Sequence, residues 1–167
     1  MPDPVAKAPK KVPKKVPNDH TKYLILGCGS TGYNIAEELI KETDDIVLVD
    51  YDEKRVEDLR DQKYEAFVRD QHDPNLFEDL PVPGVIFVMS NDKEANLAVV
   101  RTARKVYPKS HIFVRTIDPV SVGTFRDAGA DLVIYPQEVV AKAAVHHTRK
   151  LISSRMARRL YLSLIHI

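Results

Sequence analysis

Residues 23–32 carry the sequence YLILGCGSTG, a short apolar run that leads directly into a glycine-rich turn. The apolar run is typical of a buried strand, and the residues after the turn have the periodicity of a helix. The spacing is G-x-G-x-x-G, in which the first glycine allows a tight turn and the second lets the backbone approach a pyrophosphate. The third lets the helix pack closely on the strand. The pattern predicts a Rossmann-type strand–turn–helix unit that binds phosphates on Gly27, Gly29 and Gly32.

Other side chains near this turn are suited to a nucleotide. The helix that begins at the turn offers free N–H groups and the positive end of its dipole, and Ser30 and Thr31 add hydroxyl donors. Asp50 ends the next strand, where a carboxylate accepts the two ribose hydroxyls of an adenosine. It would repel a 2′-phosphate, which favours NAD(H), ATP, ADP or AMP over NADP, although the nearby Lys54 and Arg55 weaken that argument. The alternative role for Asp50 is a helix cap.

The rest of the chain alternates between two patterns. Runs typical of buried strands alternate with amphipathic helical segments, and this alternation predicts an α/β fold with a parallel sheet covered on both faces. Right-handed crossovers favour a Rossmann-type, doubly wound sheet of about six strands, followed by a C-terminal helical extension. The predicted strands are 23–26, 46–49, 65–68, 85–89, 111–114 and 132–134, and the predicted helices are 31–42, 53–62, 92–107 and 119–128.

The sequence divides into four segments. Residues 1–20 contain five Pro and five Lys, a composition that predicts a disordered tail. Residues 21–137 form the predicted nucleotide-binding domain, and 138–161 a linker or dimerisation helix. Two arrangements of that helix are open: it packs on a partner or a following domain, or it folds back on its own sheet. Residues 162–167, LSLIHI, resemble the translation of a sequencing-adapter read-through, so we expect the natural chain to continue beyond them.

Composition and charge restrict the class of protein. The chain has 167 residues, 44% of them hydrophobic and 29% charged, which is typical of one globular domain. No apolar stretch is long enough to cross a bilayer, and a single cysteine, Cys28, excludes an internal disulfide and a cysteine-rich metal site. A cytoplasmic location is therefore expected.

The net charge of +1 is unevenly distributed along the chain. Residues 1–20 carry +3, residues 139–167 carry +6 and residues 21–138 carry −8. We therefore expect no nucleic acid to bind the acidic central domain.

Several further stretches resemble one family, the RCK or TrkA amino-terminal domains that regulate potassium channels and transporters. The resemblance covers roughly residues 21–145. It is carried by VLVDYDEKRV at 47–56, SNDKEANL at 90–97, Arg115 with Asp118-Pro119, and GAD at 129–131 with PQE at 136–138. The chain departs from the family after the third strand, where Arg69-Asp70-Gln71 stands in place of Gly-Asp-Ala.

The resemblance implies a dimeric nucleotide binder without catalytic residues or a metal, responding to NAD(H) or to ATP, ADP or AMP. By position, Asp50 would bind the ribose and Asp70 would line the adenine pocket, and Tyr51 would belong to the same cofactor site. Ser90 and Asn91 would border the nucleotide, and Arg115 would reach toward phosphate. The implied partner is a potassium channel or transporter subunit, which would hold the domain at the periphery of the membrane.

Two other functions remain open from the sequence. Some archaeal proteins carry such a domain before a DHH-type phosphoesterase, and residues 153–161 resemble the helix that joins the two, although no DHH motif is present. An NAD-dependent oxidoreductase is the third interpretation. It is weakened because no substrate domain is present and because no histidine has a paired acid at catalytic spacing along the sequence.

Overall fold

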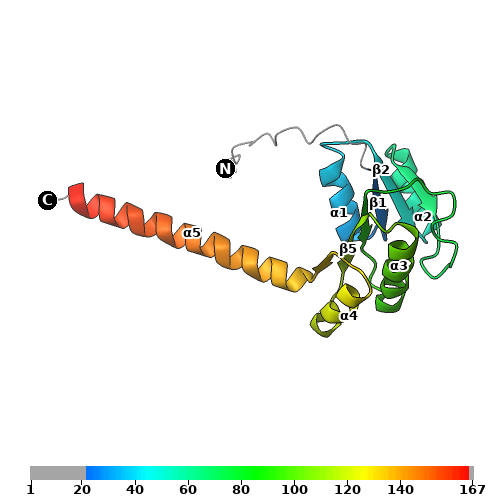
Figure 1. Ribbon diagram of the computed structural model, residues 1–167. Helices are drawn as coiled ribbons and strands as arrows, with labels where there is room; N and C mark the ends of the chain where they lie inside the picture. Colours follow the sequence, from blue (N-terminus) through cyan, green and yellow to red (C-terminus); the bar gives the residue numbers. More distant parts are fainter. Residues whose placement is uncertain (1–21, 166–167) are drawn as a thin grey trace.

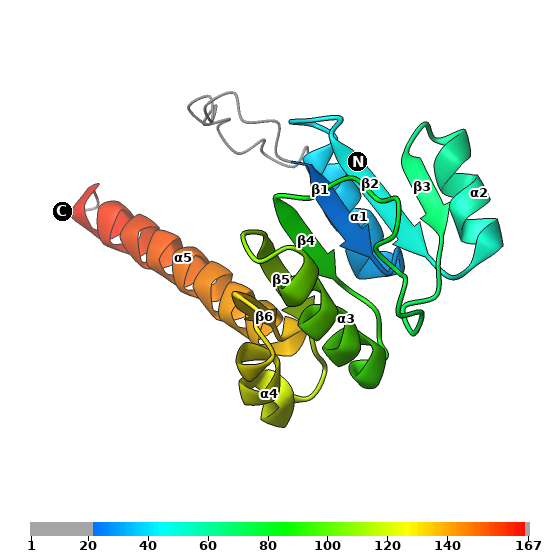
Figure 2. The same cartoon turned by 45° about the vertical axis from the view of Figure 1, so that its right-hand side comes forward.

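The computed structural model describes residues 22–165, with side chains described as far as Met156. The predicted tail, residues 1–20, lies outside the described residues. Six parallel strands form one sheet in the order β3-β2-β1-β4-β5-β6 (Figures 1 and 2). The order reverses between β1 and β4, which is the position where doubly wound sheets bind ligands. The predicted α/β, Rossmann-type fold is confirmed.

The elements alternate along the chain as the apolar pattern predicts. The strands are β1 (Tyr23–Leu26), β2 (Ile46–Asp50), β3 (Glu65–Val68), β4 (Val85–Val88), β5 (His111–Arg115) and β6 (Leu132–Ile134). The helices are α1 (Ser30–Leu39), α2 (Glu53–Asp61), α3 (Lys93–Val106), a 3-10 turn η1 (Pro119–Ser121), α4 (Val122–Asp127) and α5 (Pro136–Ile165).

Two apolar layers hold the sheet. Along β1, Leu24 and Leu26 point into one layer and Ile25 into the other, because successive strand residues face opposite sides. The layer around Ile25 is closed by α1 and α2, and the opposite layer by α3 and α4. The centres of the inner strands are therefore covered on both sides, most completely in β1 and β2, and for this reason the middle of each strand is apolar.

The connection from β3 to β4 departs from the helix that a doubly wound fold usually places there. Residues 69–84 form turns without a helix, and Leu76, Phe77 and Leu80 from this loop fill the core beside α3. The predicted turn at Asp73-Pro74 lies within this loop. Three residues near the start of this loop, Asp70, Gln71 and His72, line the cleft described below.

Two predicted helices differ from the structure, the first at its end and the second at its beginning. The first ends at Leu39 instead of Glu42, because the N–H groups of Glu42 and Thr43 both bond the Leu39 carbonyl and close the helix in a turn. The segment 119–128 begins as the 3-10 turn η1 before α4, with Asp118 accepting a hydrogen bond from the Val120 N–H.

Helix α5 projects away from the sheet as a long rod (Figure 1). Its apolar residues are exposed: Val140 is 66% accessible, Leu151 63% and Met156 60%. The arrangement in which this helix folds back on its own sheet is therefore wrong for the described part of α5. The predicted boundary at residues 137 and 138 falls inside the first turn of the helix.

Candidate nucleotide site

A cleft of about 600 Å³ lies at the carboxyl ends of the strands, where the sheet order reverses. The register aligns Leu26 of β1 with Val49 of β2 and Val88 of β4, so the residues that follow these strands meet at one edge. Ten of the eleven predicted site residues line the cleft: Gly27, Gly29, Ser30, Thr31, Asp50, Tyr51, Asp70, Ser90, Asn91 and Arg115. Gly32 lies behind the turn and not in the cleft.

The three glycines of the turn have three different surroundings. Gly27 has φ +88°, and a Cβ there would come within 2.7 Å of the Ser90 nitrogen. A Cβ on Gly32 would overlap the carbonyl oxygen of Gly27. A Cβ on Gly29 would meet no protein atom within 4 Å, and its backbone angles, φ −65° and ψ −170°, suit any residue. Gly29 therefore leaves open space in the cleft that the fold itself does not require.

The start of α1 keeps its N–H groups free of side-chain caps. Helices α2 and α3 and the turn η1 begin with Asp52, Asp92 and Asp118, each of which accepts a hydrogen bond from the first turn. Helix α1 begins at Gly29, which has no side chain to do so. Because the first N–H groups of a helix lack partners within it, this end of α1 presents donors and a positive dipole end to the cleft.

The buried Asp50 carboxylate is hydrogen-bonded to the backbone of the glycine-rich turn. Its Oδ2 accepts from the Cys28 N–H at 2.7 Å, and its Oδ1 accepts from the Asp52 N–H at 3.0 Å and from the Arg55 guanidinium at 2.9 Å. Only 2% of the side chain is exposed. The helix-cap alternative belongs to Asp52, which accepts from the Arg55 N–H, so Asp50 is free of that role.

The residues beyond Asp50 form the outer wall. Tyr51 is 73% exposed at the rim, and Asp70 lies on the loop after β3, where its Oδ1 accepts from the His72 N–H at 2.9 Å. Gln71 occupies the position where the family has alanine and is buried against the cleft.

A buried amide connects the ends of β4 and β5. Asn96, 1% exposed, donates to the carbonyls of Ser90 and Arg115 at 3.0 and 3.3 Å and accepts from the Ser90 hydroxyl at 2.6 Å. The Arg115 side chain donates to Asn91, and its Nε is buried without a hydrogen-bond partner in the described structure. An unpaired buried N–H is costly, so Arg115 holds a donor that a ligand can satisfy.

One histidine lies beside an acid in the folded chain, although spacing along the sequence does not pair them. His72 Nε2 lies 3.2 Å from Asp92 Oδ2, across the mouth of the cleft. The hydrogen bond from the Ala95 N–H, followed by the contact with His72, holds the pKa of Asp92 below its usual range. Both side chains are more than half exposed, so the contact is a weak surface pair. Twenty residues separate the two along the chain, which is why spacing did not show it.

The cleft also contains residues that sequence reasoning did not assign to the site. They are Arg55, Gln71, His72, Met89, Asp92 and Ala95. Arg55 and Asp92 carried a signal: each lies at the first turn of a helix that follows a strand end, and so at the edge where the site forms. His72 carried none, because the loop that places it has no periodicity.

Cys28 is expected to be unreactive in the native protein. Burial, and next the charge of Asp50, raise the pKa of its thiol to about 12, so the thiolate that attacks electrophiles is scarce. We expect iodoacetamide at about pH 8 to leave native Cys28 unlabelled and to label it fully in guanidinium, where the pKa returns to about 8.5. Mass spectrometry measures the label, and rapid labelling of the native protein would contradict the burial.

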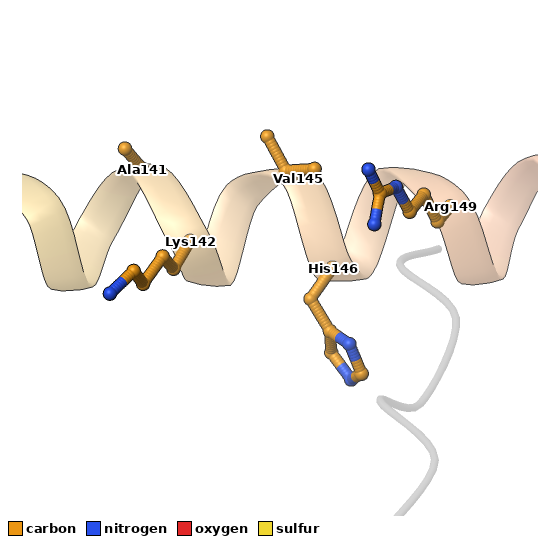
Figure 3. A pocket seen from close by; sticks show the side chains of 5 residues that line it. All are labelled: Ala141, Lys142, Val145, His146 and Arg149. Carbon is orange, nitrogen blue, oxygen red and sulfur yellow. The ribbon is translucent and has the colours of Figure 1, made fainter.

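A second, shallow hollow runs along α5 (Figure 3). Ala141 and Val145 point to one side of the helix and Lys142 and His146 to the other, so the lining residues do not converge on a common point. Among the described residues, no group of three or more His, Cys, Asp or Glu side chains gathers around a metal position. No helix within the described part of the chain has the length and apolar character to span a bilayer.

Two curated relatives are potassium transport proteins. The chain is 27% identical over 146 residues to potassium channel protein 1 of Methanocaldococcus jannaschii, covering 82% of this chain and 44% of the relative. It is 32% identical over 120 residues to the putative K(+) efflux antiporter KefB of Alkalimonas amylolytica, covering 71% of this chain and 18% of the relative. The chain thus spans less than half the length of either one.

Solved structures share the fold. The NAD(P)-binding domain of an exopolyphosphatase-related protein from Archaeoglobus fulgidus superposes with a TM-score of 0.72 at 24% identity, covering 78% of this chain and 98% of that one. The Kef C-terminal domain of Shewanella denitrificans in its AMP-bound form gives 0.66 at 19% identity, covering 83% and 87%. The GsuK channel bound to NAD gives 0.61 at 20%, covering 73% and 22%.

A model of the TrkA-N domain matches residues 23–136, from the first residue of β1 to the first residue of α5. The match includes the glycine turn, Asp50 and the loop ends that line the cleft. This chain belongs to the TrkA-N domain family.

Proposed function

We propose that this domain binds an adenine nucleotide in the cleft and acts as a sensor. The proposal rests on the open space beside Gly29 at the uncapped start of α1. A side chain at Gly29 would occupy this space, and the packing of the fold does not require glycine there. The phosphates would rest on Gly29, Ser30 and Thr31, an arrangement that helix N-termini favour. The unpaired Nε of Arg115 supports a second anionic contact on the opposite wall.

The remaining site residues follow from that placement. With the phosphates at the turn, the ribose would lie over the end of β2 at Asp50, and the base beyond it between Tyr51 and Asp70. Ser90 and Asn91 would border the phosphates from β4. The neighbour bound to NAD supports NAD(H) as the ligand. The neighbour bound to AMP supports the alternative, which is ATP, ADP or AMP.

We further propose that nucleotide binding regulates potassium transport by an attached membrane protein. Both curated relatives, a potassium channel protein and a potassium efflux antiporter, support this partner. The domain would then lie in the cytoplasm at the membrane periphery and act without catalysis. A ligand shifts such a partner only if it binds two states with different affinity. Helix α5, exposed along its apolar side, is the element suited to transmit the shift and, over residues 138–161, to join two copies as a homodimer.

A hydrolase is the second candidate partner. It is suggested by the Archaeoglobus structure, a domain of an exopolyphosphatase-related protein that shares the fold with this chain. Reading the genomic sequence beyond Tyr161 separates the two, since a membrane protein partner predicts no phosphoesterase motif there.

Direct titration tests nucleotide binding. We expect NAD, NADH, ATP, ADP or AMP to bind by calorimetry and to raise the midpoint of thermal unfolding, with about 2.7 kcal/mol of stabilisation at a hundred times Kd. Uridine monophosphate serves as the control ligand, because it has a phosphate and a ribose but no adenine. If none of the adenine nucleotides binds, the proposed function is wrong.

A further inference from the structure

The carboxylate at the end of β2 differs from the one that a strict NAD site presents. In such a site an accessible carboxylate accepts the ribose hydroxyls and repels a 2′-phosphate. Here Asp50 is 2% exposed, and three protein donors already occupy its oxygens. Since a carboxylate has about four acceptor positions, little of its capacity is left for a ribose.

The group that faces the cleft beside Asp50 is a cation. The side chain of Arg55 lines the cleft and is 38% exposed. Its Nη1 lies 2.9 Å from Asp50 Oδ1, and its Nη2 lies 3.6 Å from Asp52 Oδ2. Two carboxylates thus contact the guanidinium at the end of β2, and part of the Arg55 side chain remains exposed in the cleft.

We propose that this site accepts an adenosine with a 2′-phosphate, and that Arg55 is the residue that binds this phosphate. The inference rests on the proposed function, and it extends the ligand class to NADP(H). A guanidinium near the ribose is the usual device for a 2′-phosphate, because its planar fork donates two N–H groups to phosphate oxygens. Asp50, buried and paired, contributes less repulsion than an exposed carboxylate, because Arg55 compensates its charge.

Paired ligands that differ by a single phosphate test this assignment. Calorimetry on the full chain compares 5′-AMP with adenosine 2′,5′-bisphosphate, and NAD with NADP. In each pair, we expect the ligand with the 2′-phosphate to bind the wild-type protein at least as tightly as the ligand without it, or with a Kd no more than about threefold higher. Arg55→Gln should then weaken the 2′-phosphorylated ligands about tenfold or more relative to their partners, as expected from loss of one charge-assisted contact.

Lys54 provides the matched control. It is exposed, precedes Arg55 on the same helix turn and does not line the cleft. Lys54→Gln removes the same charge and should change the ratio of the two affinities less than about twofold, because an exposed charge is screened. Arg55→Lys keeps the charge beside Asp50 and should retain part of the preference, which separates phosphate binding from support of the turn.

The outcomes distinguish the two proposals. If the wild type binds AMP and NAD but binds their 2′-phosphorylated partners more than about tenfold more weakly, the inference is wrong and the proposed function stands. If Arg55→Gln weakens both members of each pair equally, Arg55 only supports Asp50 and the assignment fails. If no ligand of either pair binds the wild type, and NADH, ATP and ADP do not bind either, the proposed function itself fails.

Discussion

Gly29→Asp is expected to weaken adenine-nucleotide binding by about a hundredfold or more, while the protein stays folded. A side chain at Gly29 points into open space, so the fold tolerates it. The carboxylate would stand where the phosphates rest and would repel them. It would also cap α1, since Asp is a favoured N-cap residue, and occupy the N–H groups that a phosphate needs. Losing contacts worth about 3 kcal/mol corresponds to roughly a hundredfold in Kd.

The stability of this variant separates a loss of nucleotide binding from a loss of folding. Because Asp at the N-cap exceeds Gly by only a few tenths of a kcal/mol, we expect the free energy of unfolding in denaturant to stay equal or to rise slightly. Gly123→Asp is the control: Gly123 is also exposed, and a Cβ there also meets nothing, but it lies on α4 and not in the cleft. That variant should bind as the wild type does. Wild-type affinity in Gly29→Asp would place the phosphates elsewhere.

The strands and the glycine turn were predictable because their signals are local. An apolar run such as residues 46–49 has to be buried on both faces, and a turn with G-x-G-x-x-G spacing has to follow the first strand. Parallel strands then bring their carboxyl ends to one edge, so Asp50, Ser90 and Arg115 meet in the cleft although they are far apart in sequence.

The remaining features depend on tertiary structure. The loop 69–84 has no period, and only the folded core shows that Leu76 and Phe77 anchor it so that His72 reaches Asp92. The pairing of Arg55 with Asp50 was equally hidden, because a helical residue five positions after a strand end has several orientations open to it. The apolar pattern of α5 was visible, but a stripe does not identify the surface that covers it.

Gly32→Ala is expected to act through stability, in contrast to Gly29. Its Cβ would overlap the Gly27 carbonyl oxygen and come within 3.3 Å of Ile25 Cγ2. The first of these contacts is backbone, so α1 has to move away from β1 to relieve it. We expect a loss of about 3 kcal/mol or more, larger than the roughly 1 kcal/mol that alanine gains over glycine inside a helix. Denaturant unfolding monitored by circular dichroism measures the loss.

A matched substitution and a ligand titration show whether the packing of α1 on β1 is the cause. Gly123→Ala places the same methyl group in open space on another helix, and should be neutral or stabilising by about 0.5–1 kcal/mol. A wild-type free energy of unfolding for Gly32→Ala would mean that α1 does not pack on the turn this closely. If nucleotide at about a hundred times the variant's own Kd restores roughly 2.7 kcal/mol, the displaced helix still presents its N–H groups to the phosphates. Gly32 would then set how closely α1 packs, and Gly29 whether a phosphate fits.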